Sequence, residues 1–231
     1  TVLTTGANSG IGLATTLELA RRGFRSVGSV RTRAKAKAVA EAARAAGVEV
    51  ETVLLDVTDA ARCASVVARL QPYALVNNAG YSLTGAVEDV GDEEARQLFE
   101  TMVHAPMRLI RLALPALRGQ QGRVVNVSSI AGLATAPFAG HYAGAKHALR
   151  ALAQSMAREL GPQGIHVAHI VVDGAIDSAF IRENLPDADE RRARDGLLIP
   201  DEIAKNYVWL HRQHRSAWTH ELDLRPWNES W

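Results

Sequence analysis

The residues most able to do chemistry are a tyrosine and a lysine four positions apart, preceded by a serine. Tyr142 and Lys146 have the spacing that places two side chains on one face of a helix. A phenol has an ordinary pKa of about 10, and a nearby ammonium favours its charged form. Ser129 can hydrogen-bond an oxygen on which negative charge develops. Together they predict proton transfer at a substrate oxygen; the plainer alternatives are a surface lysine and a loop hydroxyl bonded to its own backbone.

A glycine-rich turn follows the first apolar run of the chain. Glycines let backbone N–H groups approach a pyrophosphate, and the N-terminus of the following helix favours negative charge. We therefore predict a dinucleotide-binding turn, the alternative being a tight strand-to-helix turn that binds nothing. The predicted binding residues of this turn are Gly6, Asn8, Ser9, Gly10, Ile11 and Gly12.

The end of the second predicted strand favours NADP(H) over NAD(H). An acidic residue there would bind the adenosine ribose of NAD, whereas an arginine can accept the 2′-phosphate of NADP. The sequence has Val30 and Arg31 at this place, with no acid in reach. A guanidinium can donate two hydrogen bonds to a phosphate at once. The alternative is a solvated basic turn.

Two more turns follow predicted strands. Asp56 and Val57 come after the third strand and are expected to hold the adenine, although Asp56 could equally cap a helix. Asn78, Ala79 and Gly80 come after the fourth strand, at the carboxyl edge where ligands bind in parallel sheets. The same residues could also form a bare turn.

These turns need a sheet that brings strand ends together, and the sequence predicts one. Short apolar runs alternate with long helical patterns, which favours a doubly wound parallel sheet with helices on both faces. The predicted strands cover residues 2–4, 24–30, 48–55, 74–76, 122–127, 166–172 and 219–224. The predicted helices cover residues 10–22, 34–46, 58–70 with Thr58 as cap, 92–118, 141–160 and 201–211. Residues 177–200 fit no element.

Composition excludes several classes of function. The 231 residues are 47% hydrophobic and 22% charged, as is ordinary for a soluble globular protein, and we expect one domain over residues 1–231. A formal net charge of +1 gives no strong field to recruit nucleic acid or an anionic membrane. One cysteine, Cys63, allows no internal disulfide, and no residue set predicts a metal site. With no signal peptide or membrane span in the pattern, we expect a cytoplasmic protein.

The motifs together resemble the short-chain dehydrogenase/reductase family, in its compact single-domain branch, from residue 1 to about 180. The motifs that carry the resemblance are Thr5-Gly6-x-x-x-Gly10-Ile11-Gly12, Asp56, Asn77-Asn78-Ala79-Gly80, Ser129 and Tyr142-x-x-x-Lys146. The resemblance implies a Rossmann-type three-layer sandwich with a mainly parallel sheet of about seven strands. It also implies a homodimer or homotetramer.

The resemblance further implies hydride transfer between NADP(H) and a small or medium carbonyl or alcohol. Tyr142 would be the acid in reduction and the base in oxidation, and Ser129 would orient the substrate oxygen. Lys146 would bind the nicotinamide ribose and lower the pKa of Tyr142. Ile176 and Ser178 would meet the nicotinamide carboxamide. The expected substrate loop, about residues 175–200, is polar over residues 177–200, but together with the loops near 82–86 and 130–141 it offers a largely apolar lining, which favours an apolar substrate. The lining side chains are Leu83, Leu133, Phe138, Ile176 and Phe180.

Three departures from the family pattern stand out. Met102 occupies the position of an asparagine that organises a proton-relay water in many relatives, and Asp173 replaces the usual proline before Gly174. The tail, about residues 213–231, is unlike the common family ending. Two alternatives to the reductase remain open: a non-catalytic NADP(H) sensor, and an epimerase or dehydratase with the same tyrosine–lysine chemistry.

Overall fold

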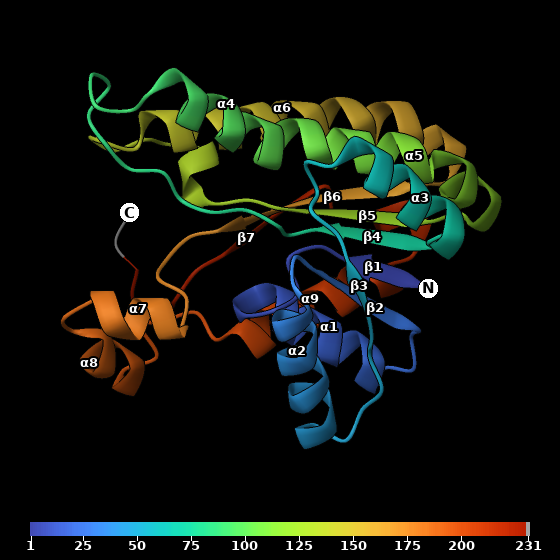
Figure 1. Cartoon of the computed structure of the whole chain (residues 1–231), viewed down its shortest axis with the longest axis horizontal. Helices are drawn as coiled ribbons and strands as arrows, with labels where there is room; N and C mark the ends of the chain where they lie inside the picture. Colours follow the sequence, from blue (N-terminus) through green and yellow to red (C-terminus); the bar gives the residue numbers. More distant parts are fainter. Residues whose placement is uncertain (230–231) are drawn as a thin grey trace.

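The computed structural model describes residues 1–229, which contain one seven-stranded sheet (Figure 1). The strands are β1 (Val2–Thr4), β2 (Ser26–Val30), β3 (Glu51–Leu54), β4 (Ala74–Asn77), β5 (Arg123–Val127), β6 (His166–Val172) and β7 (Glu221–Leu224). Their order is β3-β2-β1-β4-β5-β6-β7, and every neighbouring pair is parallel. Residues 230 and 231, at the end of the predicted tail, lie outside the described part.

Helices cover both faces of the sheet, so the predicted doubly wound three-layer fold is confirmed (Figure 1). One face carries α1 (Gly10–Arg21), α2 (Arg33–Ala45) and α9 (Pro200–Arg212). The other carries α3 (Ala60–Leu70), α4 (Asp92–Phe99), α5 (Ala105–Gln120) and α6 (Gly140–Leu160). The short helices α7 (Ala179–Asn184) and α8 (Ala188–Ala193) lie at the end of the molecule opposite the N-terminus.

The coverage on both faces explains the continuous apolar runs that identified the strands. Every residue of β1 and β6 is buried, as expected when a parallel strand is packed on both sides. One core cluster joins the sheet to α3 and α5, and its largest side chains include Leu75, Leu109 and Leu117. A second cluster joins the sheet to α1 and α9, around Ile170 and Ile203.

Several predicted boundaries were wrong in instructive ways. Asp59, not Thr58, caps α3, because its carboxylate accepts the Arg62 N–H at 2.8 Å. Thr58 instead donates its hydroxyl to Asp56 at 2.8 Å. The long helix predicted over residues 92–118 is interrupted by a π-helical segment, Glu100–His104, between α4 and α5. The polar stretch that fitted no element contains α7 and α8.

The turn between β1 and α1 packs closely on the chain that leaves β4. A Cβ atom on Gly12 would lie 2.3 Å from the Gly6 carbonyl oxygen and 2.4 Å from the Asn78 side-chain nitrogen. A Cβ atom on Gly6 would lie 2.9 Å from the Ala79 Cα. The two glycines therefore permit a backbone approach that any side chain would prevent.

This contact predicts opposite effects for two helical glycines. Gly12→Ala should destabilise the protein by about 1–3 kcal/mol, because the turn must shift to admit the methyl group. Gly119→Ala in α5, where an added Cβ meets nothing within 4 Å, should stabilise it by about 0.4–1 kcal/mol. Urea unfolding of both variants measures the difference. A Gly12→Ala protein as stable as wild type would contradict the close approach.

Candidate active site

The residues predicted to bind cofactor or act in catalysis gather at the carboxyl ends of β1 to β6 and in the first turns of α6. The chain adds β2 and β3 on one side of β1 and then β4 on the other side, so the order of strand addition reverses between β1 and β4. Ligands of doubly wound sheets bind in the crevice at such a switch point. The topology therefore brings the predicted residues to one edge.

Hydrogen bonds fix the first turn to the end of β4. The Thr5 hydroxyl accepts the backbone N–H groups of Asn78 and Ala79, each at 3.0 Å. The Asn78 side chain donates to the carbonyl oxygens of Thr5 at 2.9 Å and Gly6 at 3.2 Å. Its amide nitrogen thus holds the turn in place, and the predicted contact of Asn78 with a cofactor stays a prediction.

The shape of the first turn fits a dinucleotide pyrophosphate. Helix α1 begins at Gly10, so its first backbone N–H groups have no acceptor within the helix. Gly10 has a φ of +51°, and a Cβ atom there would meet nothing within 4 Å, which leaves open space beside the turn. Asn8 and Ser9 bond to each other at 3.1 Å and border the same turn as Ile11. Open space beside unpaired amides is what an anion requires.

Arg31 and Asp56 lie near each other, after the neighbouring strands β2 and β3. Hydrogen bonds from Thr58 and the charge of Arg31 hold the pKa of Asp56 below its ordinary value. The Arg31 side chain is exposed, so its guanidinium is free to meet a ligand phosphate. Val57 is buried, and its carbonyl accepts an Arg108 N–H at 3.2 Å. The pair Arg31–Asp56 marks the predicted adenosine end of the site.

The three predicted catalytic residues are brought together where α6 meets the end of β5. Lys146 is 6% exposed, and its ammonium donates to the Val127 carbonyl at 3.0 Å. The same ammonium lies 5.7 Å from the centre of the Tyr142 ring. Ser129, two residues after Val127, accepts the Ala131 N–H at 3.2 Å, and its hydroxyl is close enough to the Tyr142 phenol to lower the pKa of that phenol. The group can therefore hold a substrate oxygen between a hydroxyl and a phenol.

Burial sets the pKa values of this group. It raises the pKa of Tyr142 above its ordinary value, and the Ser129 hydrogen bond offsets only part of that rise. It also lowers the pKa of Lys146 to about 8. We expected Lys146 to lower the pKa of Tyr142, but in the protein alone burial raises it. Burial disfavours the charged form of each group, the Tyr142 phenolate and the Lys146 ammonium, because both lose contact with water.

Met102 lies beside the site as an apolar contact. It is 3% exposed, within the π-helical segment, and a Cβ atom on Gly80 would lie 2.9 Å from its Cε. It belongs to the same cluster as Leu98 and Tyr142. The position where many relatives carry a relay asparagine is therefore filled by a packed methionine.

A row of polar residues that was not predicted from the sequence crosses the sheet below α6. Asn77, Asn126, His169 and Glu221 occupy the same register on β4 to β7. Asn77 donates to the Asn126 side chain at 2.9 Å, and Arg150 of α6 binds the Glu221 carboxylate at 2.6 and 2.9 Å. His169 is fully buried, and burial lowers its pKa to about 4. Polar residues inside apolar runs were the available signal.

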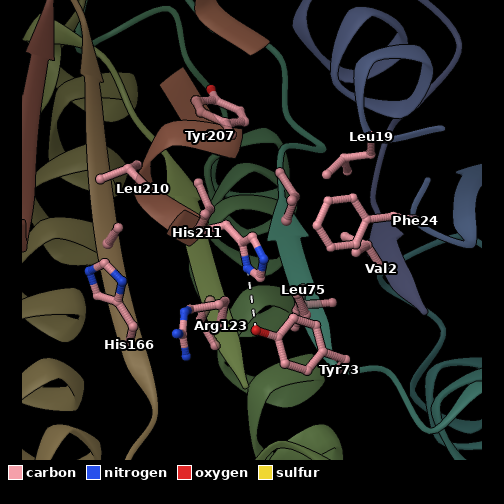
Figure 2. A pocket seen from close by; sticks show the side chains of 15 residues that line it. Val2, Leu19, Phe24, Tyr73, Leu75, Arg123, His166, Tyr207, Leu210 and His211 are labelled. Atoms are coloured by element: carbon pink, nitrogen blue, oxygen red, sulfur yellow. Dashed lines mark hydrogen bonds between the residues drawn. The ribbon is translucent and has the colours of Figure 1, made fainter. Parts of the chain in front are cut away.

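A small cavity lies at the opposite edge of the sheet, between the amino ends of the strands and α9 (Figure 2). Its volume of about 30 Å³ has room for one or two water molecules and not for a dinucleotide. Figure 2 shows His211 pointing into it, bonded through Nδ1 to the Tyr73 hydroxyl at 3.3 Å. His211 is therefore half-buried and hydrogen-bonded.

Residues 1–229 were searched for metal-binding clusters and for helices that could span a membrane. In this part of the chain, no cluster of three or more histidine, cysteine, aspartate or glutamate side chains could hold a metal ion. Within the same residues, every helix is too short or too polar to cross a membrane.

Comparison with known proteins places the chain in a family. A family model described as short chain dehydrogenase matches residues 1–189. The uncharacterised oxidoreductase YusZ of Bacillus subtilis is 39% identical over 175 residues, which cover 73% of this chain and 62% of that protein. The match therefore spans less than two thirds of the length of that relative.

Two further relatives match more completely. The 3-oxoacyl-(acyl-carrier-protein) reductase FabG of Pseudomonas aeruginosa is 33% identical over 218 residues, 88% of this chain and 86% of the reductase. The structure of an alcohol dehydrogenase from Thermococcus sibiricus, in complex with 5-hydroxy-NADP, matches with a TM-score of 0.85 and 26% identity, over 99% of this chain and 97% of that one. This protein belongs to the short-chain dehydrogenase/reductase family of oxidoreductases.

Proposed function

We propose that this protein interconverts a carbonyl and an alcohol with NADP(H) as its hydride carrier. The observation that carries the proposal is the position of Tyr142 beside the buried Lys146 ammonium, which is bonded to Val127 two residues before Ser129, at the switch point of the sheet. A hydroxyl, a phenol and an ammonium in this arrangement suit acid–base catalysis at an oxygen.

Each residue has a separate role in the proposed reaction. In the reductive direction the Tyr142 phenol donates its proton to the carbonyl oxygen, and in the oxidative direction the phenolate accepts it from the alcohol. The Ser129 hydroxyl hydrogen-bonds the same oxygen and stabilises its developing charge. The Lys146 ammonium uses one N–H on Val127, which leaves others for the cofactor ribose, and its charge favours the phenolate. When bound, NADP(H) supplies or accepts the hydride.

Arg31 supports the assignment of NADP(H). Its exposed guanidinium stands after β2, where a 2′-phosphate would lie, and the neighbouring Val30 offers no carboxylate for a ribose. The similar alcohol dehydrogenase of Thermococcus sibiricus was solved with 5-hydroxy-NADP. Ile176 and Ser178, after β6, are proposed to meet the nicotinamide carboxamide. NAD(H) is the less favoured cofactor.

Exposed aromatic side chains support an apolar substrate of small or medium size. Phe138 is 66% exposed and Phe180 is 65% exposed, although large apolar side chains are usually buried. Both belong to segments proposed to border the substrate, before α6 and within α7. Leu83, in the loop after β4, packs against the Met102 cluster. A carbonyl with an aliphatic or aromatic chain fits these contacts.

We also propose that the protein is a cytoplasmic homodimer or homotetramer. A groove of about 560 Å³ runs between α5 and α6 on the outer face and exposes Met107, at 40%, beside Leu152 and Met156. Long helices paired across such a groove would cover these apolar side chains. We also propose that residues 1–231 form a single domain.

The proposed role of Tyr142 as proton donor predicts that loss of its hydroxyl group lowers turnover. Tyr142→Phe keeps the ring and its packing and removes the transferable proton, so turnover of a ketone should fall at least about 10²-fold. NADPH affinity should stay within a few-fold of wild type. Tyr73→Phe, at the opposite edge of the sheet, is the control and should retain activity. Near-normal turnover by Tyr142→Phe would refute the role; NADPH binding without turnover by wild type would favour a sensor.

The cofactor assignment predicts a selective loss at Arg31. Arg31→Ala should weaken NADPH binding by about 1–3 kcal/mol, since it removes a charged hydrogen-bond donor, and should leave NADH binding nearly unchanged. Titration of both cofactors measures the two dissociation constants. Arg44→Ala, an exposed residue at the other end of α2, is the control. Equal losses for NADPH and NADH would contradict recognition of the 2′-phosphate.

The buried Lys146 predicts a dependence of stability on pH. Between about pH 8 and 10.5 the unfolded chain keeps a proton that folded Lys146 releases, so the free energy of unfolding should rise with pH through this range. Below about pH 8 both states hold the proton, and Lys146 adds no slope. Urea unfolding of Lys146→Met should lack this rise, whereas the exposed control Lys205→Met should keep it. Equal slopes for wild type and Lys146→Met would contradict the burial of the charge.

A further inference from the structure

The two departures near the end of the chain, Asp173 and the tail, are in contact. The Arg225 guanidinium, just after β7, lies 3.3 Å from the Asp173 carboxylate, just after β6. The side chains are only 15% and 12% exposed, respectively. Arg225 also pairs with Asp223 on the strand before it. An ion pair of this low exposure is screened less by salt and water than one on the open surface.

Backbone contacts continue the attachment on both sides of this ion pair. The Asp173 N–H donates to the Leu224 carbonyl at 2.8 Å. Gly174 has a φ of +141°, and a Cβ atom on it would lie 2.8 Å from the Pro226 ring. The tail thus seats directly on the turn that follows β6, and a side chain at residue 174 would push it away.

The segment that begins at this turn is the one proposed to meet the nicotinamide. Ala175 accepts the Leu198 N–H and Asp177 donates to the Leu198 carbonyl, both at 2.9 Å. The Asp177 carboxylate, 8% exposed, binds Arg182 of α7 at 2.7 Å and Arg192 of α8 at 3.2 Å. The segment is therefore fastened to the two short helices.

The tail also reaches the far end of those helices. The Trp227 indole N–H and the Asn228 side-chain N–H both donate to the Arg194 carbonyl, at 3.2 and 3.4 Å. Arg194 is the C-cap residue of α8, directly after Ala193. One stretch of four residues, Arg225–Asn228, thus contacts the start of the segment and the end of the helices that hold it.

We propose that Arg225–Asn228 is a strap that positions residues 173–178 for the nicotinamide, with Arg225 as its principal positioning residue. The proline that usually occupies the position of Asp173 restricts φ through its ring, whereas Asp173 does not. Contacts with other residues must therefore fix this turn. The ion pair, the Leu224 hydrogen bond and the Pro226 contact supply them. The inference rests on the proposed function, because it assigns the strap to the cofactor site of that reaction.

The test is a double-mutant cycle at the ion pair. Arg225→Gln and Asp173→Asn should each weaken NADPH binding roughly 3- to 30-fold, and the double variant should bind no more weakly than the poorer single variant, because both act through one contact. Arg225→Lys should recover most of the affinity, since it keeps the charge. Arg69→Gln removes a surface pair with Glu51 at the same distance of 3.3 Å and is the matched control, with unchanged binding.

Hydrogen exchange of the folded proteins without cofactor gives a second readout. Amides of residues 174–196 should exchange faster in Arg225→Gln than in wild type, while those of β4 and β5 keep their protection. If Arg225→Gln does not fold, Trp227→Phe keeps an aromatic ring, removes the indole donor to Arg194 and should show the same local increase. Unchanged exchange of residues 174–196 in the variant that folds would overturn the strap.

The binding results distinguish failure of the strap from failure of the proposed function. Wild-type protein that binds no NADPH would overturn the proposed function and the strap together. Wild-type protein that binds NADPH, with the same affinity in Arg225→Gln and Asp173→Asn, would overturn the strap alone. Strictly additive losses in the double variant would also overturn it, because the two residues would then act separately.

Discussion

The site depends on one constraint: the Lys146 ammonium is buried and must keep a hydrogen-bond acceptor. Burying a charge is costly unless it is paired or bonded, and the Val127 carbonyl at 3.0 Å provides the bond. Because Lys146 is on α6 and Val127 is near the end of β5, this bond fixes the helix against the strand. Tyr142 lies one helical turn before Lys146, and Ser129 lies two residues after Val127. The same contact therefore sets the distance between the phenol and the hydroxyl.

Hydrogen bonds between polar side chains of neighbouring strands hold the sheet in place beside this contact. Thr5 and Asn78 tie the turn after β1 to the end of β4, and Asn77 binds Asn126 across β4 and β5. Hydrogen-bonded amides inside a sheet avoid much of the cost of burying polar groups. His169 extends the row in its neutral form, because burial holds its pKa at about 4. The bonds of Thr5, Asn78 and Asn77 thus tie β1, β4 and β5 together below the surface on which a dinucleotide would lie.

Local pattern predicted the parts of the fold and site that depend on nearby residues. The glycine turn, the parallel strands and the spacing of Tyr142 and Lys146 could all be read from short stretches. Features that depend on distant partners could not: Arg225 meets Asp173 only after β6 and β7 have paired. The pKa of Tyr142 also escaped prediction, because its direction depends on how deeply α6 buries the phenol. Asp59 replaced Thr58 as a cap because Asp56 engages the threonine hydroxyl.

Hydride transfer itself is tested most directly with NADPH that carries deuterium at the transferable position of its nicotinamide. The protein is incubated with labelled NADPH and an apolar ketone, and the product is analysed by mass spectrometry. Label on each of the two faces of the nicotinamide is tried separately. One of the two labelled forms should yield an alcohol with one deuterium on the former carbonyl carbon. An alcohol without deuterium from both forms, or an isomerised or dehydrated product with the label retained in NADPH, would contradict the proposed hydride transfer.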